Sequence, residues 1–170
     1  VSILLVSIIM ICMLVVHIQP VQAASSSYGT PRTGTVYDDN GIVIKITGCE
    51  EKFSSYRVLF YVENNTDDNL RIQLRDLSVN GYMVNNVCST DVNAGKKANG
   101  SFSVSESDLE ANDISVIESM EFKFCIIRTE ASPSERFSYT PIIKLLFDPV
   151  SHTHVFDSGV VTDYPTCTMN

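Results

Sequence analysis

Apolar and polar residues alternate along much of the chain between residues 36 and 147, and this two-residue period is typical of strands with one buried face. The clearest run places Met120, Phe122 and Phe124 on one face, with Glu121 and Lys123 between them. Similar apolar runs lie at 35–37, 42–46, 56–63, 70–75, 77–79, 82–84, 102–104, 142–147, 155–156 and 160–161. The pattern predicts a chain built mainly from short strands.

Turn signals separate these runs. Asn40-Gly41 and Asn80-Gly81 each lie between two apolar runs. Both residue types accept positive φ, so each pair predicts a two-residue hairpin. Loops are expected at three polar segments, 64–69, 91–100 and 131–141.

A single short helix is expected over residues 105–112, where Ser105 and Asp108 have capping-box spacing. Short strands, close turns and almost no helix favour an all-β, immunoglobulin-like antiparallel β-sandwich of about seven to nine strands. The chain has no tryptophan, so the antibody-type core with a tryptophan against a disulfide does not apply.

An uncharged apolar run covers residues 3–16 and leads through Pro20 to Val21 and Ala23. This order is typical of an export signal, and the small residues at positions 21 and 23 predict cleavage after Ala23. The run is shorter than the about 20 apolar residues that span a bilayer, and an uncleaved membrane anchor is the alternative. The expected organisation is a signal peptide at 1–23, a flexible linker at 24–35, the sandwich at 36–164 and a tail at 165–170.

The formal net charge of the chain is −8, and Arg32 is its first charged residue other than histidine. An acidic chain repels nucleic-acid phosphates and anionic membrane surfaces. The adjacent Lys96 and Lys97 are typical of a solvated loop. We therefore expect no nucleic-acid partner, and membrane contact only if the N-terminal segment stays uncleaved.

Four cysteines remain after the expected cleavage: Cys49, Cys88, Cys125 and Cys167. An even number in an exported chain permits two disulfides with three connectivities, and free thiols are the alternative. No two of these cysteines have the C-x-x-C spacing of a metal-binding turn, which excludes the familiar zinc arrangements.

Four motifs carry a family resemblance: YVENNT at 61–66, VNGYMV at 79–84, DVNAGKKAN at 91–99 and SDLE at 107–110. In these motifs the chain resembles uncharacterised immunoglobulin-like domains of bacterial secreted proteins, related in fold to the immunoprotective extracellular antigens. The resemblance covers about residues 36–127. It implies a β-sandwich on the outside of a Gram-positive-type cell, and it implies no catalytic residues.

The sequence offers ligands for two kinds of metal site. His152 and His154 share one face of an extended segment, a spacing that can begin a zinc or copper site, but no third ligand is evident. The acidic segments 38–41 and 67–69 offer oxygen ligands for calcium, but neither fits an EF-hand loop. We interpret all of them as polar turns or loops and expect no cofactor.

The sequence gives only weak evidence for catalysis or glycosylation. Nucleophilic catalysis needs a base beside a serine or cysteine, and the chain has no Gly-x-Ser-x-Gly motif. Asn64 and Asn99 fit the N-glycosylation sequon and are expected on exposed loops. A bacterial setting argues against modification at either asparagine.

The sequence therefore predicts a non-enzymatic immunoglobulin-like module, secreted or on the outer face of the cell envelope. Its partner would be an extracellular protein, a glycan or a wall component, and a purely structural spacer is a further alternative. Leu59 and Tyr61, on the nominally outer face of one strand, are a candidate binding patch unless the tail covers them. The alternative from another functional class is a metal-dependent hydrolase using His152 and His154.

Overall fold

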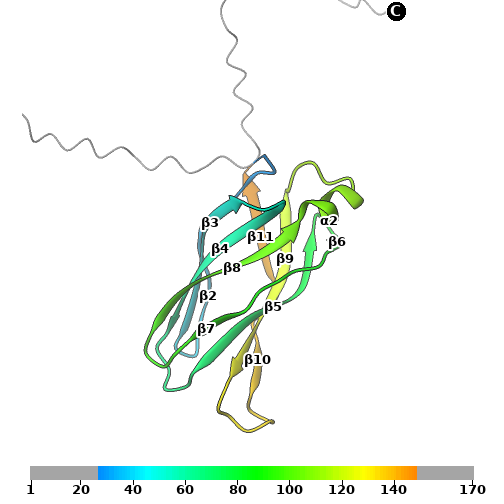
Figure 1. Cartoon of the computed structure of the whole chain (residues 1–170). Coiled ribbons are helices and arrows are strands. Elements are labelled where there is room, and N and C mark those ends of the chain that lie inside the picture. Colours follow the sequence, from blue (N-terminus) through cyan, green and yellow to red (C-terminus); the bar gives the residue numbers. More distant parts are fainter. Residues whose placement is uncertain (1–26, 149–170) are drawn as a thin grey trace, which may run out of the picture.

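The computed structural model describes residues 27–148, which form two antiparallel sheets packed face to face (Figure 1). The smaller sheet has four strands in the order β2-β3-β4-β8. Their bounds are Gly34–Asp39 for β2, Ile42–Glu51 for β3, Ser55–Asn64 for β4 and Lys97–Ser105 for β8. The pairs β2·β3, β3·β4 and β4·β8 are all antiparallel.

The larger sheet has seven strands, with the path β1-β11-β9-β5-β6 and with β10 and β7 pairing with β9 and β5. Their bounds are Thr30–Pro31 for β1, Leu70–Val79 for β5, Tyr82–Met83 for β6, Thr90–Val92 for β7, Ser119–Arg128 for β9, Phe137–Tyr139 for β10 and Ile143–Asp148 for β11. Of the eleven strands in the described residues, seven have six or more residues. The architecture confirms the predicted immunoglobulin-like antiparallel β-sandwich.

Both predicted hairpins are confirmed. Asn40 and Gly41 have φ values of 51° and 77° between β2 and β3, and Asn80 and Gly81 have 49° and 89° between β5 and β6. Positive φ at both central residues suits the right-handed twist of the flanking strands. The Asn80 Oδ1 atom also accepts a hydrogen bond of 2.9 Å from the Glu118 N–H, so the second turn is tied to the start of β9.

The predicted short helix is α2 (Glu106–Ala111). Ser105 is its N-cap residue, and the Ser105 Oγ atom accepts a hydrogen bond of 3.1 Å from the Asp108 N–H. Leu109 is completely buried, so one face of this helix closes the end of the core. The capping spacing had therefore identified the helix start correctly.

Four phenylalanines join the two sheets at the centre of the core. Phe60 and Phe102 come from the four-stranded sheet, whereas Phe122 and Phe124 come from β9 of the other sheet. Ring centroids lie 5.2 Å apart for Phe60–Phe124, 5.0 Å for Phe102–Phe122 and 5.4 Å for Phe122–Phe124. The alternation in the sequence had placed Phe122 and Phe124 on the buried face, and both are buried.

The expected linker at 24–35 is partly structured, because its described portion includes β1 and the start of β2. The Tyr56 hydroxyl, which is buried, donates a hydrogen bond of 3.0 Å to the Gly29 carbonyl. Arg32 forms an ion pair of 3.1 Å with Asp148 at the end of β11. These contacts join residues that are distant in sequence. The local composition of residues 24–35 therefore indicated only a linker.

Two expected loops are also shorter than predicted. The prediction of a loop over the whole of 91–100 was wrong, because β7 ends at Val92 and β8 begins at Lys97. Segment 131–141 contains β10, which pairs with Cys125–Ile127 of β9. In both cases pairing with a distant strand overrides the polar, glycine- or proline-containing local sequence.

Candidate binding surfaces

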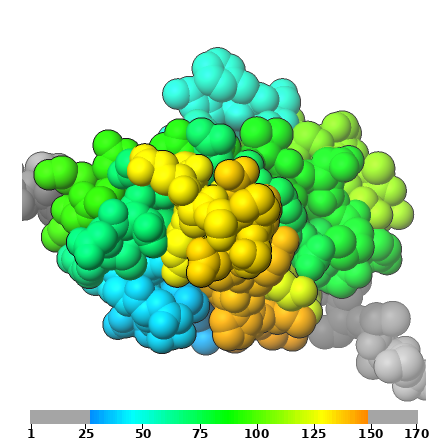
Figure 2. Space-filling view, turned by 90° about the horizontal axis from the view of Figure 1, so that it is seen from below, coloured from blue at the N-terminus to red at the C-terminus, as the bar shows by residue number. Residues whose placement is uncertain are grey.

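Two exposed aromatic residues lie on β10, at the end of the seven-stranded sheet. Phe137 and Tyr139 expose 54% and 58% of their surface, whereas Ser138 between them faces the other way and its hydroxyl bonds to the Ile126 carbonyl. In Figure 1, β10 and its preceding loop extend beyond the lower ends of the other strands, and Figure 2 shows this yellow-orange projection from below. We call Phe137 and Tyr139 the aromatic edge.

The aromatic edge is also a free strand edge. β10 pairs with β9 on one side, and no other strand of residues 27–148 pairs with it. Unpaired backbone N–H and C=O groups on an edge can bind an added strand. Exposed aromatic rings and free backbone groups therefore lie together at this end of the molecule.

The thiol of Cys125 lies beneath this surface. Cys125 is 1% exposed although it points away from the core, because β10 pairs across it with Tyr139 opposite. A hydrogen bond with Cys125 raises the pKa of Tyr139 above its ordinary value. The phenol presents a hydroxyl beside an apolar ring.

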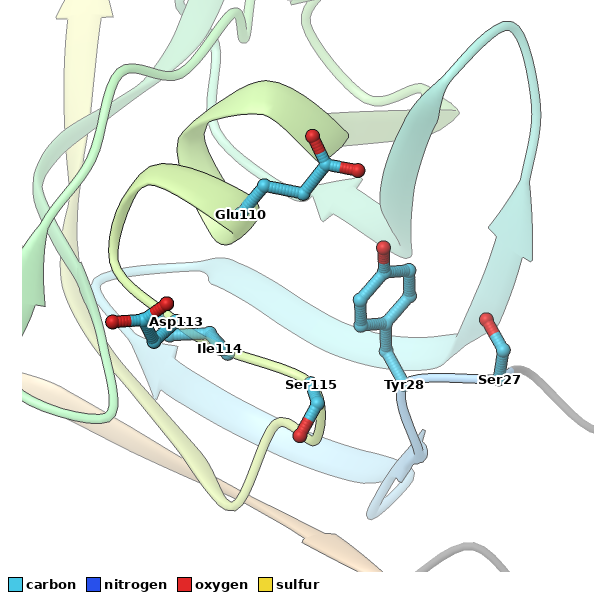
Figure 3. Close-up of a pocket in the computed structure, with 6 residues that line it drawn as sticks. All are labelled: Ser27, Tyr28, Glu110, Asp113, Ile114 and Ser115. Atoms are coloured by element: carbon cyan, nitrogen blue, oxygen red, sulfur yellow. The ribbon is translucent and has the colours of Figure 1, made fainter.

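A second surface feature is a hollow of about 540 Å³ next to α2. It is lined by Ser27, Tyr28, Glu110, Asp113, Ile114 and Ser115 (Figure 3). Figure 3 shows the Tyr28 ring pointing toward the helix that carries Glu110. Burial raises the pKa of Tyr28, and the negative charges of Glu106, Glu110 and Glu51 raise it further. An aromatic ring among carboxylates suits a cationic group better than an anion.

Metal binding finds no support in the described residues. Within 27–148, no group of three or more His, Cys, Asp and Glu side chains could hold a metal ion. His152 and His154 lie outside the described residues. In the two acidic segments, Asp39 bonds to the Asn40 N–H and Asp68 pairs with Arg128, so these carboxylates hold turns and strands together.

The predicted disulfides are not formed among the described cysteines, because Cys49, Cys88 and Cys125 are free thiols. Cys167 lies outside the described residues, and any bridge to it stays a prediction. The three described cysteines lie on different parts of the sandwich: Cys49 on β3, Cys125 on β9, and Cys88 between β6 and β7. Since two disulfides need all four cysteines, the expected pair of bridges is absent from this structure.

Cys88 is expected to resist alkylation while the protein is folded. Burial raises the pKa of its thiol to about 11, from 9.0. Because the thiolate is the nucleophile, its reaction with iodoacetamide at pH 8 should be about 100 times slower in the folded than in the urea-unfolded chain. Peptide mass spectrometry of timed samples measures both rates. Equal rates would contradict the burial of this thiol.

The same shift has a consequence for stability. The pKa of the Cys88 thiol is higher in the folded than in the unfolded chain. The contribution of this thiol to the free energy of unfolding is therefore complete below about pH 9 and is lost as the pH rises through about 11. A Cys88→Ala variant should not show the decrease in stability at high pH that ionisation of this thiol causes. Urea unfolding at pH 8 and at pH 10.5 gives the comparison.

Leu59 and Tyr61 do not form an apolar patch. Both are half-buried, and the Tyr61 hydroxyl donates a hydrogen bond of 3.1 Å to Glu63. Lys97 on the next strand lies 3.6 Å from the same carboxylate. Charged and polar neighbours therefore surround Leu59 and Tyr61.

The aromatic edge was not predicted from the sequence. The signal that could have indicated it is the alternation of Phe137, Ser138 and Tyr139, which is the period of a strand.

The two glycosylation sequons differ in exposure. Asn64 is completely buried at the end of β4, so the prediction that it lies on an exposed loop was wrong. Its side chain donates to the carbonyls of Asp68, Val92 and Asn93, at 2.8, 3.3 and 3.1 Å. Asn99 is exposed but lies on β8 rather than on a loop. Asn64 therefore joins two loops and is inaccessible to modification.

No helix in the described part of the chain is long and apolar enough to cross a membrane. No protein-family model matches the chain, and no curated protein is significantly similar to it. Among solved structures, the chain is similar to the one titled "Crystal structure of yeast GGA1_GAE domain-P21", at 9% identity and a TM-score of 0.39. That similarity covers 66% of this chain and 97% of the yeast domain, and we draw no functional conclusion from it.

Proposed function

We propose that this chain is a non-enzymatic immunoglobulin-like module that is secreted or held on the outer face of a bacterial envelope, and that it binds an extracellular protein through the aromatic edge. The location is supported by the export signal that the sequence predicts at 1–23, which lies outside the described residues, and by the resemblance to secreted bacterial domains. The observation that carries the binding function is the exposure of Phe137 and Tyr139 on a free strand edge.

Several physical arguments favour a protein partner over a glycan or a wall component. Exposed aromatic residues are common energetic centres of protein interfaces. A free strand edge can add an extended segment from another chain, with backbone hydrogen bonds supplying affinity and side chains supplying specificity. The hydrolase alternative rests on His152 and His154, and no contact in the described residues supports it.

The proposal predicts that Phe137→Asp and Tyr139→Asp weaken partner binding at least tenfold, because each puts a charge where an aromatic ring would be buried. The matched control is Phe53→Asp, which changes another exposed aromatic residue. Phe53 lies in the β3–β4 turn, at the opposite end of the sandwich from β10 (Figure 1). All three sites are exposed, so melting temperatures should stay close to the wild type.

The measurement is retention of envelope proteins on the immobilised wild type and on each variant. We expect one protein to be retained by the wild type and by Phe53→Asp and to be depleted on both β10 variants. Equal retention by all four chains would place the binding surface elsewhere. No specific retention by the wild type would favour a structural spacer.

A further inference from the structure

A small hollow lies on the seven-stranded sheet, beside the aromatic edge. It has a volume of about 490 Å³ and is lined by Arg75, Asp76, Lys123, Tyr139 and Thr140. Tyr139 therefore belongs both to the hollow and to the aromatic edge. We call this feature the basic hollow, because two of its three charged residues are cations.

The strand register brings both cations to the same face as the aromatic edge. Arg75 of β5 and Lys123 of β9 are directly opposite each other in an antiparallel pair, so their side chains share one face of the sheet. Cys125, two residues farther along β9, is opposite Tyr139 of β10. Tyr139 is therefore one row away from Lys123 on that face, a separation that aromatic and long side chains can bridge. The aromatic edge and the basic hollow form one continuous surface.

One of the two cations is neutralised by a neighbouring carboxylate. Like charges at directly opposite positions of a sheet repel each other. The register of β5 shifts after Arg75, and Asp76 at this irregularity has a φ of 57°. Such a bulge re-aims a side chain, and the Asp76 carboxylate lies 3.0 Å from the Lys123 Nζ atom. The charge of Lys123 is therefore compensated within the protein.

The charge of Arg75 is not compensated in this way. Within residues 27–148, Arg75 forms no ion pair. Its guanidinium donates to the Leu74 carbonyl and to the Gln73 side-chain oxygen, which are neutral acceptors and use two of its five N–H donors. The chain has 20 Asp and Glu against 12 Lys and Arg, so carboxylates are plentiful. Four other arginines each pair with one: Arg32, Arg57, Arg71 and Arg128.

The other polar groups of the hollow are engaged. Thr140 is 3% exposed, and its hydroxyl accepts a hydrogen bond from the Phe124 N–H and donates one to the Pro141 carbonyl. The Tyr139 hydroxyl has its hydrogen bond with Cys125. The free donors of Arg75 are therefore the groups to which a ligand in the hollow would bind. The planar fork of a guanidinium fits a carboxylate, with which it forms paired, charge-assisted hydrogen bonds.

We propose that the protein partner carries an acidic side chain, aspartate or glutamate, that enters the basic hollow and pairs with Arg75. This inference rests on the proposed binding function of the aromatic edge. Because the two features form one surface, the acidic residue and the apolar residue that covers Tyr139 belong to one extended segment of the partner. The net charge of −8 disfavours an acidic segment elsewhere on this chain, so the pairing with Arg75 sets where the segment binds.

NMR titration of the purified chain with two synthetic peptides tests this inference without the natural partner. The probes are acetyl-Val-Thr-Glu-Val-Thr-amide and the same peptide with glutamine in place of glutamate. The wild type should bind the glutamate peptide about five times more tightly, because only a carboxylate compensates the charge of Arg75. The signals of Arg75 and Tyr139 should shift on binding.

Arg75→Gln should bind both peptides equally. The matched control is Arg71→Gln, which removes the same charge from the same face of β5 and should keep the preference for the glutamate peptide. Arg71 is already paired with Asp91 at 2.6 Å and has no role in the basic hollow. Both arginines are exposed, so the melting temperatures should stay close to the wild type.

Three outcomes would overturn the inference. The wild type would bind neither peptide, it would bind both equally, or Arg71→Gln would lose the preference as fully as Arg75→Gln, which would assign it to the overall charge of the chain. Failure of the aromatic edge gives a different result. Equal retention of envelope proteins by the Phe137→Asp variant, with the peptide preference intact, would reject the aromatic edge and still support the carboxylate site at Arg75.

Discussion

Replacing Asn64 by aspartate should destabilise the protein by about 3–5 kcal/mol, which is the usual effect of an uncompensated buried charge. The Asn64 side-chain amide donates to three carbonyl oxygens, and its Oδ1 atom accepts from the N–H and hydroxyl of Thr66. An aspartate can accept the two Thr66 bonds but cannot donate to the three carbonyls. Its charge would instead lie beside their oxygen atoms, at a site with no exposed surface.

Urea unfolding measures this effect, and Asn99→Asp is the matched control because Asn99 is exposed on the neighbouring strand. The control should change the free energy of unfolding by less than about 0.5 kcal/mol. Burial should raise the folded-state pKa of the new carboxyl, so the defect should shrink as the pH is lowered toward 4. A similar small effect at both positions would contradict the role of Asn64 in joining the two loops.

Replacing Gly100 by alanine should destabilise the protein by about 2–3 kcal/mol, as overpacking of a closed core does. A Cβ atom at this position would lie 2.5 Å from the Phe60 Cζ atom and would also overlap the Thr90 hydroxyl. Phe60 is completely buried and is packed between Phe102 and Phe124, so its ring has no free space to enter. The close approach of β8 to this ring therefore requires glycine.

A double-mutant cycle measures this steric coupling. Phe60→Leu leaves room beside residue 100, so Gly100→Ala should cost clearly less in the Phe60→Leu background than in the wild type. Asn99→Ala, on the same strand but exposed, is the control for changes in β8 itself. Additive losses in the double variant would mean that the ring of Phe60 is not the obstacle.

Much of the fold could be predicted because its signals are local. The alternation around Phe122 and the Asn-Gly pairs at 40–41 and 80–81 depend only on neighbouring residues, and the structure follows them. The N-cap at Ser105 is equally local. Such elements form where strand period, turn geometry and capping agree.

The errors concern contacts between residues distant in sequence. Gly29 joins the sandwich through the hydroxyl of Tyr56, and β10 exists because β9 supplies its pairing partner. Asn64 was expected on an exposed loop, but it is buried because the segment after β7 closes over it. Polar sequence indicated a loop in each case, and packing from another part of the chain decided the outcome.

The candidate binding surface was harder to predict than the fold. Leu59 and Tyr61 attracted attention as apolar residues on an outer face, but their surroundings are set by Lys97 and Glu63 across the sheet. Phe137 and Tyr139 lay within a segment rich in serine with two prolines, which indicated only a loop. Exposure and edge position become visible only when the strands are paired.

Site-specific photocrosslinking on the cell that makes the protein tests the proposed binding function most directly. A photoreactive phenylalanine analogue would replace Phe137, Tyr139 or, as the control, Phe53. We predict one and the same adduct from positions 137 and 139 and none of that mass from position 53. No adduct at either β10 position, or the same adduct from all three, would contradict a binding function of the aromatic edge.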